Sequence, residues 1–149
     1  NYGGMGWQYT LELVDAIPGL KLVFDTGNPV FSDDRAKPAP CPKQSAWDFY
    51  QHVRQHIAYI HIKDGMMETG PDGAPRPRFT FCGEGVGDVK RIVADLFKTG
   101  YDGGFSIEPH LAVVFHDEKV KSEDAVRYAN YVEYGKRFTT ILREAGYKA

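Results

Sequence analysis

Three residues that could bind a metal ion each lie at the end of a short apolar stretch of the sequence: Asp25, His61 and Glu108. Two carboxylates and an imidazole form a hard, oxygen-rich donor set with one nitrogen, which suits Mn²⁺, Mg²⁺ or Co²⁺ and less readily Zn²⁺. Singly, each residue has an ordinary structural explanation: a turn or cap aspartate, a hydrogen-bonded core histidine, and a glutamate paired with a lysine. A metal site therefore depends on whether the three stretches are strands whose ends meet.

The apolar stretches have the length and composition of buried strands. Residues 20–24, 58–62 and 104–107 are predicted strands, and the first of them is bounded by glycine on both sides. Helices are predicted between and around them, at 10–17, from Ser45 to Ile57, after Asp88 and after Ser122. The apolar residues of 89–97 recur at helical spacing, which makes this the clearest helix of the chain.

Strands that alternate with helices about 40 residues apart predict parallel βα units and an α/β fold. Residues 64–87 are rich in glycine and proline, and we expect one long loop there with a short β-element at "RFTF". The stretch "GEGVGD" lacks the ending of a phosphate-binding loop and is predicted to be a turn before the Asp88 helix cap. Because parallel strands end on one face, Asp25, His61 and Glu108 are expected to converge.

Composition limits the class of protein. The chain of 149 residues is 42% hydrophobic and 13% aromatic, enough for one ordinary domain with a sizeable core. A net charge of −2 and a pI near 6.2 favour neither a nucleic-acid nor a membrane partner. Cys41 and Cys82 form no metal-binding pair and are too few for a disulfide framework, which indicates two free thiols and a cytoplasmic protein.

Four stretches in this order resemble the second half of the sugar phosphate isomerase/epimerase family, the xylose-isomerase-like TIM barrels: "FDTGN", "HIKD", "GEGVGDVKRIVADLFKTGYDGG" and "SIEPH". The resemblance covers most of residues 1–110 and fades in the final helix. It implies that Asp25, His61 and Glu108 bind one divalent metal ion together with a further glutamate on the preceding strand.

The resemblance also implies that residues 1–149 are the C-terminal portion of a TIM (β/α)8 barrel whose N-terminal half is missing. Such a barrel needs eight strands and about 250 residues, and three strands are predicted here. The further glutamate would directly precede Asn1, the start of "NYGG". We expect the partner to be the missing half, with a homo-oligomer possible, and a natural half-barrel that dimerises is the alternative.

Candidate substrate-binding residues follow from the same resemblance. Family members that act on ketoses often have a histidine and an arginine where this chain has Asn28 and Met67. Asn28 can still hydrogen-bond to sugar hydroxyls, and Arg76 could supply positive charge, although a solvated loop arginine is the alternative. Lys63 is expected either to bind substrate or to orient His61. Asp64 is the other residue that could orient His61. Trp7 could form an aromatic wall over a sugar, or it could pack in the core.

The function implied is that of a divalent-metal-dependent isomerase or epimerase of a sugar or sugar-like polyhydroxy carbonyl compound. Proton transfer would pass through a metal-stabilised enediolate, with Glu108 as metal ligand and catalytic acid or base. One alternative is a metal-dependent dehydratase of an inosose- or shikimate-like compound, and another is a non-catalytic sugar-binding module. A barrel endonuclease would need more histidine ligands and a basic groove, and the sequence shows neither.

Overall fold

The main sheet consists of three parallel strands. The structure, a computed structural model, describes residues 6–111 and 124–148. In the sheet β2 (Ile57–Ile62) lies between β1 (Leu22–Asp25) and β5 (Gly104–Ile107). The helices are α1 (Trp7–Ala16), α2 (Asn28–Phe31), α3 (Ala46–Val53), α4 (Val89–Lys98) and α5 (Asp124–Glu144), with a 3-10 turn at Arg54–His56. The predicted α/β fold with parallel strands is confirmed.

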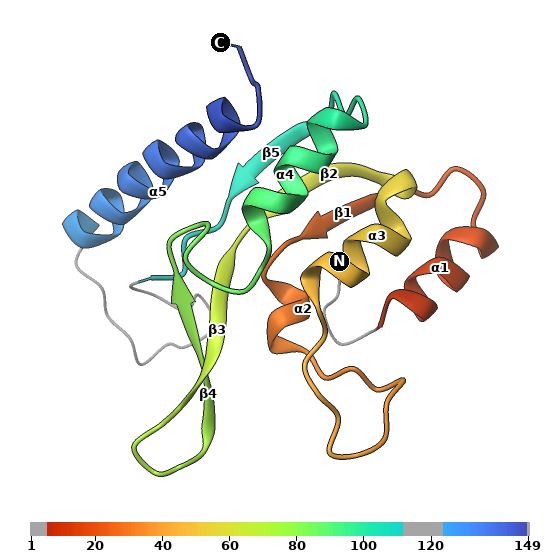
Figure 1. Cartoon of the computed structure of the whole chain (residues 1–149), viewed down its shortest axis with the longest axis horizontal. Coiled ribbons are helices and arrows are strands. Elements are labelled where there is room, and N and C mark those ends of the chain that lie inside the picture. Colours follow the sequence, from red (N-terminus) through yellow and green to blue (C-terminus); the bar gives the residue numbers. More distant parts are fainter. Residues whose placement is uncertain (1–5, 112–123, 149) are drawn as a thin grey trace.

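Helices α3 and α4 lie side by side along one face of the sheet (Figure 1). The side chain of Ser45 caps α3 by accepting a hydrogen bond of 3.1 Å from the backbone N–H of Asp48, as the sequence predicts. Asp88 precedes α4 as expected but does not cap it with its side chain, because its backbone takes a left-handed conformation with φ +53°. The apolar stripe of α4 packs into the core, where Val89, Ile92, Val93 and Leu96 are buried.

The hydrophobic core fills the space between the sheet and these helices. Phe24 of β1 and Ile60 of β2 are 1% and 0% exposed, and they belong to one cluster with α3, α4 and α5. The neighbouring residues Val23 and Tyr59 point to the opposite face, since side chains alternate along a strand. They pair in register and are 39% and 37% exposed. The described part of the chain thus leaves that face of the sheet partly uncovered.

The prediction of one long loop at residues 64–87 is wrong for most of this segment. β3 (Asp64–Thr69) and β4 (Pro75–Thr80) form an antiparallel hairpin that projects from the rest of the molecule (Figure 1). Its turn closes where the N–H of Gly70 donates to the carbonyl of Ala74 at 2.8 Å. The short β-element expected at "RFTF" overlaps the end of β4, whereas Pro75 and Pro77 weakened the strand pattern at its start. A two-stranded ribbon tolerates these prolines because one edge of each strand needs no partner.

The glycine-rich loop after the hairpin wraps around the carboxylate of Asp64. This side chain is 1% exposed and accepts hydrogen bonds from four backbone N–H groups, those of Gly65, Gly83, Gly85 and Gly87, at 2.8–3.1 Å. Burial raises the pKa of Asp64, and the four donors oppose that effect. The loop predicted as a simple turn is therefore a nest of donors for one internal anion.

Two expectations lie outside the described residues: the cap at Ser122 and the "NYGG" stretch. Within residues 6–111 and 124–148, no helix is long and apolar enough to cross a membrane.

Replacing Gly85 with alanine should destabilise the protein by at least about 2 kcal/mol. An added Cβ would lie 2.2 Å from Asp64 Oδ1 and 2.5 Å from the backbone N and O of Gly65, and backbone atoms cannot move aside cheaply. Gly135→Ala is the control, since its Cβ would meet only Ile107 Cδ1 at 3.8 Å and alanine favours a helix. Thermal unfolding followed by circular dichroism checks both; a Gly85→Ala protein as stable as the wild type would contradict this role of the loop.

Candidate metal centre

The sheet register brings the three predicted metal-binding residues together. Asp25 is the direct neighbour of His61 across β1 and β2, and His61 is the neighbour of Ser106 across β2 and β5. Glu108 follows β5, and its N–H donates to the carbonyl of Ile62 at 2.9 Å. One donor atom from each of Asp25, His61 and Glu108 lies within 4.8 Å of the others. The expected convergence is therefore observed.

Asp25 is fixed by the turn that follows β1. The side chain is buried, and its Oδ1 accepts hydrogen bonds of 2.8 Å from the backbone N–H groups of Gly27 and Asn28. Its Oδ2 lies 3.0 Å from the Nζ of Lys63. One oxygen of Asp25 therefore anchors the side chain, and the other faces the centre of the cluster.

Lys63 places its ammonium between the two carboxylates. Its Nζ is 3.0 Å from Asp25 Oδ2, 3.0 Å from Glu108 Oε2 and 3.0 Å from Asn28 Oδ1. Burial disfavours the charge, but the carboxylates of Asp25 and Glu108 outweigh this, and the pKa of Lys63 lies above its ordinary value. Lys63 thus carries a positive charge inside the site. The sequence signal is its spacing from His61, since residues i and i+2 of a strand share a face.

Glu108 is surrounded by cationic and imidazole groups. Its Oε1 contacts His61 Nδ1, and its Oε2 lies 3.6 Å from the Nε2 of His110. The contact with His110, followed by that with Lys63, lowers the pKa of Glu108 to about 2, against the effect of burial. The sequence reasoning missed His110, whose ring also stacks on Phe79 of the hairpin with centroids 4.9 Å apart. Its i+2 spacing from Glu108 was the available signal.

The donor set fits a divalent cation. Ligand atoms bound to one ion at about 2.0–2.6 Å lie at most about 4–5 Å apart, which matches the spacing of the Asp25, His61 and Glu108 atoms. The ammonium of Lys63 between two carboxylates independently shows that positive charge is stable here. The two carboxylates of Asp25 and Glu108 together carry a charge of −2, which one divalent cation would balance.

The remaining predicted residues divide into two groups. Asn28 lies at the cluster, with its Oδ1 directed at Lys63. Arg76 lies on the exposed hairpin, where its guanidinium pairs with Asp72 at 2.7 Å. Trp7 stacks on His52 of α3 with ring centroids 3.7 Å apart, and none of the three metal-site residues lines the cavity beside it. The contacts of Arg76 and Trp7 thus lie away from the cluster. Asp64 binds the glycine-rich loop described above.

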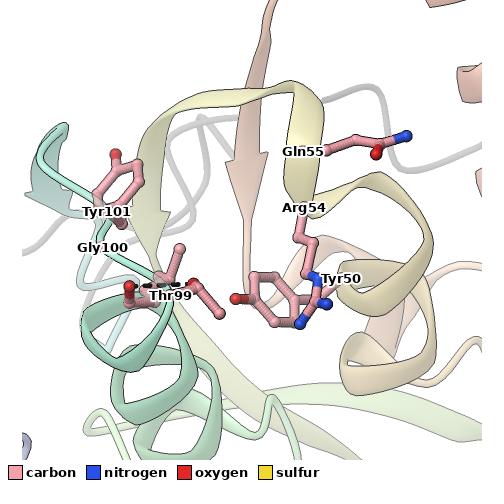
Figure 2. Close-up of a pocket in the computed structure, with 7 residues that line it drawn as sticks. Tyr50, Arg54, Gln55, Thr99, Gly100 and Tyr101 are labelled. Atoms are coloured by element: carbon pink, nitrogen blue, oxygen red, sulfur yellow. Dashed lines mark hydrogen bonds between the residues drawn. The ribbon is translucent and has the colours of Figure 1, made fainter.

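A separate cavity of about 340 Å³ lies at the opposite end of the strands (Figure 2). Arg54 and Gln55, which precede β2, and Tyr101, which precedes β5, line it. Its polar groups already pair: Asp95 Oδ2 accepts a hydrogen bond of 2.8 Å from Tyr50 and lies 3.2 Å from Arg54 Nη1. Ligands of parallel βα folds bind at the carboxyl ends of strands, so the metal-site cluster is the candidate functional site.

Comparisons with known proteins agree with the fold. The model of the xylose isomerase-like TIM barrel family matches residues 2–130. The chain is similar to a xylose isomerase domain protein from Planctomyces limnophilus, at 19% identity and a TM-score of 0.62 over 95% of this chain and 45% of that one. It is also similar to a xylose isomerase-like TIM barrel protein from Mycobacterium smegmatis in complex with magnesium, at 18% identity and a TM-score of 0.57 over 92% and 40%.

No curated protein matches the chain significantly. At these identities the two solved structures support the fold alone. The chain spans less than half the length of either.

Acid unfolding should reveal the lowered pKa of Glu108. A carboxyl group with a lower pKa in the folded state stabilises the fold above its unfolded pKa, and that contribution is lost as the pH falls through its folded value. For Glu108 the window runs from about 4.5 to about 2. Glu108→Gln should therefore weaken the pH dependence of the unfolding free energy in this window, measured with denaturant on metal-free protein. Glu68→Gln, on the exposed hairpin, is the control; equal slopes in all three proteins would contradict the assignment.

Proposed function

The chain belongs to the xylose isomerase-like TIM barrel family, and on that basis we propose that it acts in a divalent-metal-dependent isomerase or epimerase. The substrate is a small sugar or sugar-like polyhydroxy carbonyl compound. The ion proposed is Mn²⁺, Mg²⁺ or Co²⁺, and the magnesium complex of the Mycobacterium smegmatis protein is consistent with such an ion.

The observation that carries the proposal is the convergence of Asp25, His61 and Glu108 at the carboxyl ends of three parallel strands. Isomerisation through an enediolate needs a group that removes a proton beside a carbonyl and positive charge that stabilises the oxygen. The cluster supports both roles, since Glu108 offers a carboxylate and the donor set of Asp25, His61 and Glu108 could hold a cation. The cavity at the opposite strand ends lacks such a set among the residues that line it.

Glu108 is the proton-transfer group in this proposal. Its carboxyl group is ionised at neutral pH, the form that accepts a proton. The carboxylate takes the proton from the carbon beside the carbonyl, and the electron pair of that C–H bond moves toward the carbonyl oxygen. A bound divalent cation supplies the positive charge that stabilises this oxygen. Return of the proton to the former carbonyl carbon, with the proton of the adjacent hydroxyl passing to the former carbonyl oxygen, gives the isomer. Return to the other face of the original carbon gives the epimer.

The neighbouring residues hold these groups and the substrate in place. The two backbone N–H groups that bind Asp25 Oδ1 fix the orientation of its other oxygen. His61 contacts Glu108, and Asn28 places an amide at the edge of the cluster where it can hydrogen-bond to a sugar hydroxyl. Positioning of this kind lowers a barrier because the reacting atoms need no further ordering.

We further propose that additional strands complete the barrel around this sheet. β1 and β5 form the two edges of the described three-stranded sheet, and Val23 and Tyr59 remain partly exposed on its uncovered face. The solved structures similar to this chain are more than twice as long as the matched part. The missing half of the barrel would pair with both edges and supply a further metal ligand.

Residues 1–149 expressed alone should therefore be poorly stable and bind Mn²⁺ weakly. Unpaired strand edges promote association, and an incomplete ligand set lowers metal affinity. Sedimentation, thermal unfolding and calorimetric Mn²⁺ titration test this. A monomer that melts cooperatively and binds Mn²⁺ at micromolar concentration would show that these residues are self-sufficient.

In the complete protein, Glu108→Gln should reduce turnover at least about 100-fold and change substrate binding much less, because the amide cannot accept the proton. The measurement is exchange of solvent deuterium into candidate ketoses and aldoses with Mn²⁺ present. Glu68→Gln is the matched control on the exposed hairpin and should retain activity. Unchanged turnover in Glu108→Gln would remove this residue from the mechanism.

Chelator treatment distinguishes the enzyme from a non-catalytic sugar-binding module. Exchange should stop when the metal is removed and return when Mn²⁺ or Mg²⁺ is added. A protein that binds sugar equally well with and without metal, and exchanges no deuterium, would contradict the proposed function. Product analysis by mass separates isomerisation from a dehydratase reaction, since only the latter loses water.

A further inference from the structure

We propose that Lys63 is the resident cation of the metal-free site and that a divalent ion binds by displacing its ammonium from Asp25 and Glu108. The inference rests on the proposed metal site and adds a determinant of its affinity. Lys63 in this role is an internal competitor that sets how tightly the site holds metal.

The ammonium lies against one carboxylate oxygen of Asp25 and one of Glu108. Asp25 Oδ1 is engaged by two backbone N–H groups, and Oδ2 is the oxygen that faces Lys63 Nζ at 3.0 Å. Glu108 Oε2 is likewise 3.0 Å from that ammonium. An ion bound to both oxygens at about 2.1 Å would sit next to Nζ, and the two positive charges would repel strongly at that distance. Metal and ammonium therefore compete for these two carboxylates.

Lys63 is built into this position. Its backbone is fixed by Thr26, whose hydroxyl donates to the Lys63 carbonyl at 2.6 Å and accepts from the Lys63 N–H at 3.1 Å. Its side-chain stem packs against Gly27, where an added Cβ would lie 2.8 Å from Lys63 Cγ and 3.1 Å from Cδ. The residue as a whole is only 8% exposed. The Lys63 side chain is thus buried, and its stem lies in space that the absence of a side chain at Gly27 leaves open. This differs from a surface lysine that contacts a carboxylate by chance.

The arrangement has a physical benefit for the metal-free protein. Asp25 is 2% exposed, and a buried carboxylate beside a second one is costly unless a cation neutralises them. Lys63 supplies that cation until a metal ion binds, so the site stays folded before metal arrives. The consequence is a lower metal affinity, since each binding event must break both ion pairs.

Lys63→Met tests the proposal in the complete protein. The methionine keeps the length of the stem and removes the charge, so Mn²⁺ affinity measured by calorimetry should rise at least about tenfold. The chelated protein should melt several degrees lower than the wild type, and excess Mn²⁺ should remove that difference. Lys98→Met, at the exposed end of α4, is the control for loss of one positive charge and should change neither quantity.

Gly27→Ala provides a second variant that keeps the lysine. Its Cβ would push the Lys63 stem aside, and the backbone at φ −91° and ψ −32° accepts alanine. Mn²⁺ affinity should again increase. If Lys63→Met fails to fold, this variant alone tests whether Lys63 competes with the metal. If the wild type binds Mn²⁺ and the folded variants bind it equally or more weakly, the role proposed for Lys63 is overturned and the proposed function is not. Absence of Mn²⁺ binding in the wild type and both variants would overturn the proposed function as well.

Discussion

The contact of two carboxylates with one buried ammonium is the interaction on which the site depends. Asp25 and Glu108 come from strands that are not adjacent, with β2 between them, and Lys63 follows β2. Repulsion between the carboxylates would favour separation of the strand ends, and the ammonium reverses that tendency. The ion pairs thus connect the ends of all three strands of the main sheet.

Backbone donors support this interaction from two sides. The turn after β1 holds Asp25 through two N–H groups, and Thr26 in that turn holds the backbone of Lys63. On the other side, Asp64 binds the glycine-rich loop through four N–H groups. Lys63 and Asp64 are adjacent residues with opposite charges and separate partners. Because both side chains are satisfied, the chain leaves β2 in one defined direction and enters the hairpin.

The hairpin and the residues after β5 add the aromatic side of the site. Phe79 stacks on His110 and contacts the ring of Phe31, with centroids 4.9 Å apart in both cases. His110 in turn lies beside Glu108 and is the first contributor to its lowered pKa. A strand pair that was not expected from the sequence therefore helps to place a ring next to the proposed proton-transfer group. The hairpin belongs to the site as well as to the fold.

Local patterns in the sequence were sufficient for the parallel strands, the helices of the core and the three convergent residues. Period-2 and helical spacing, cap residues such as Ser45, and the rule that parallel strands end on one face are all short-range or topological signals. They could not reveal the hairpin, because Pro75 and Pro77 weaken a strand pattern that the pairing with β3 tolerates. Nor could they place the ammonium of Lys63, the donors around Asp64 or the contact of His110 with Glu108. Those depend on side-chain directions and on neighbours distant in the chain, and the charge balance of a buried site is decided only when tertiary structure brings these groups together.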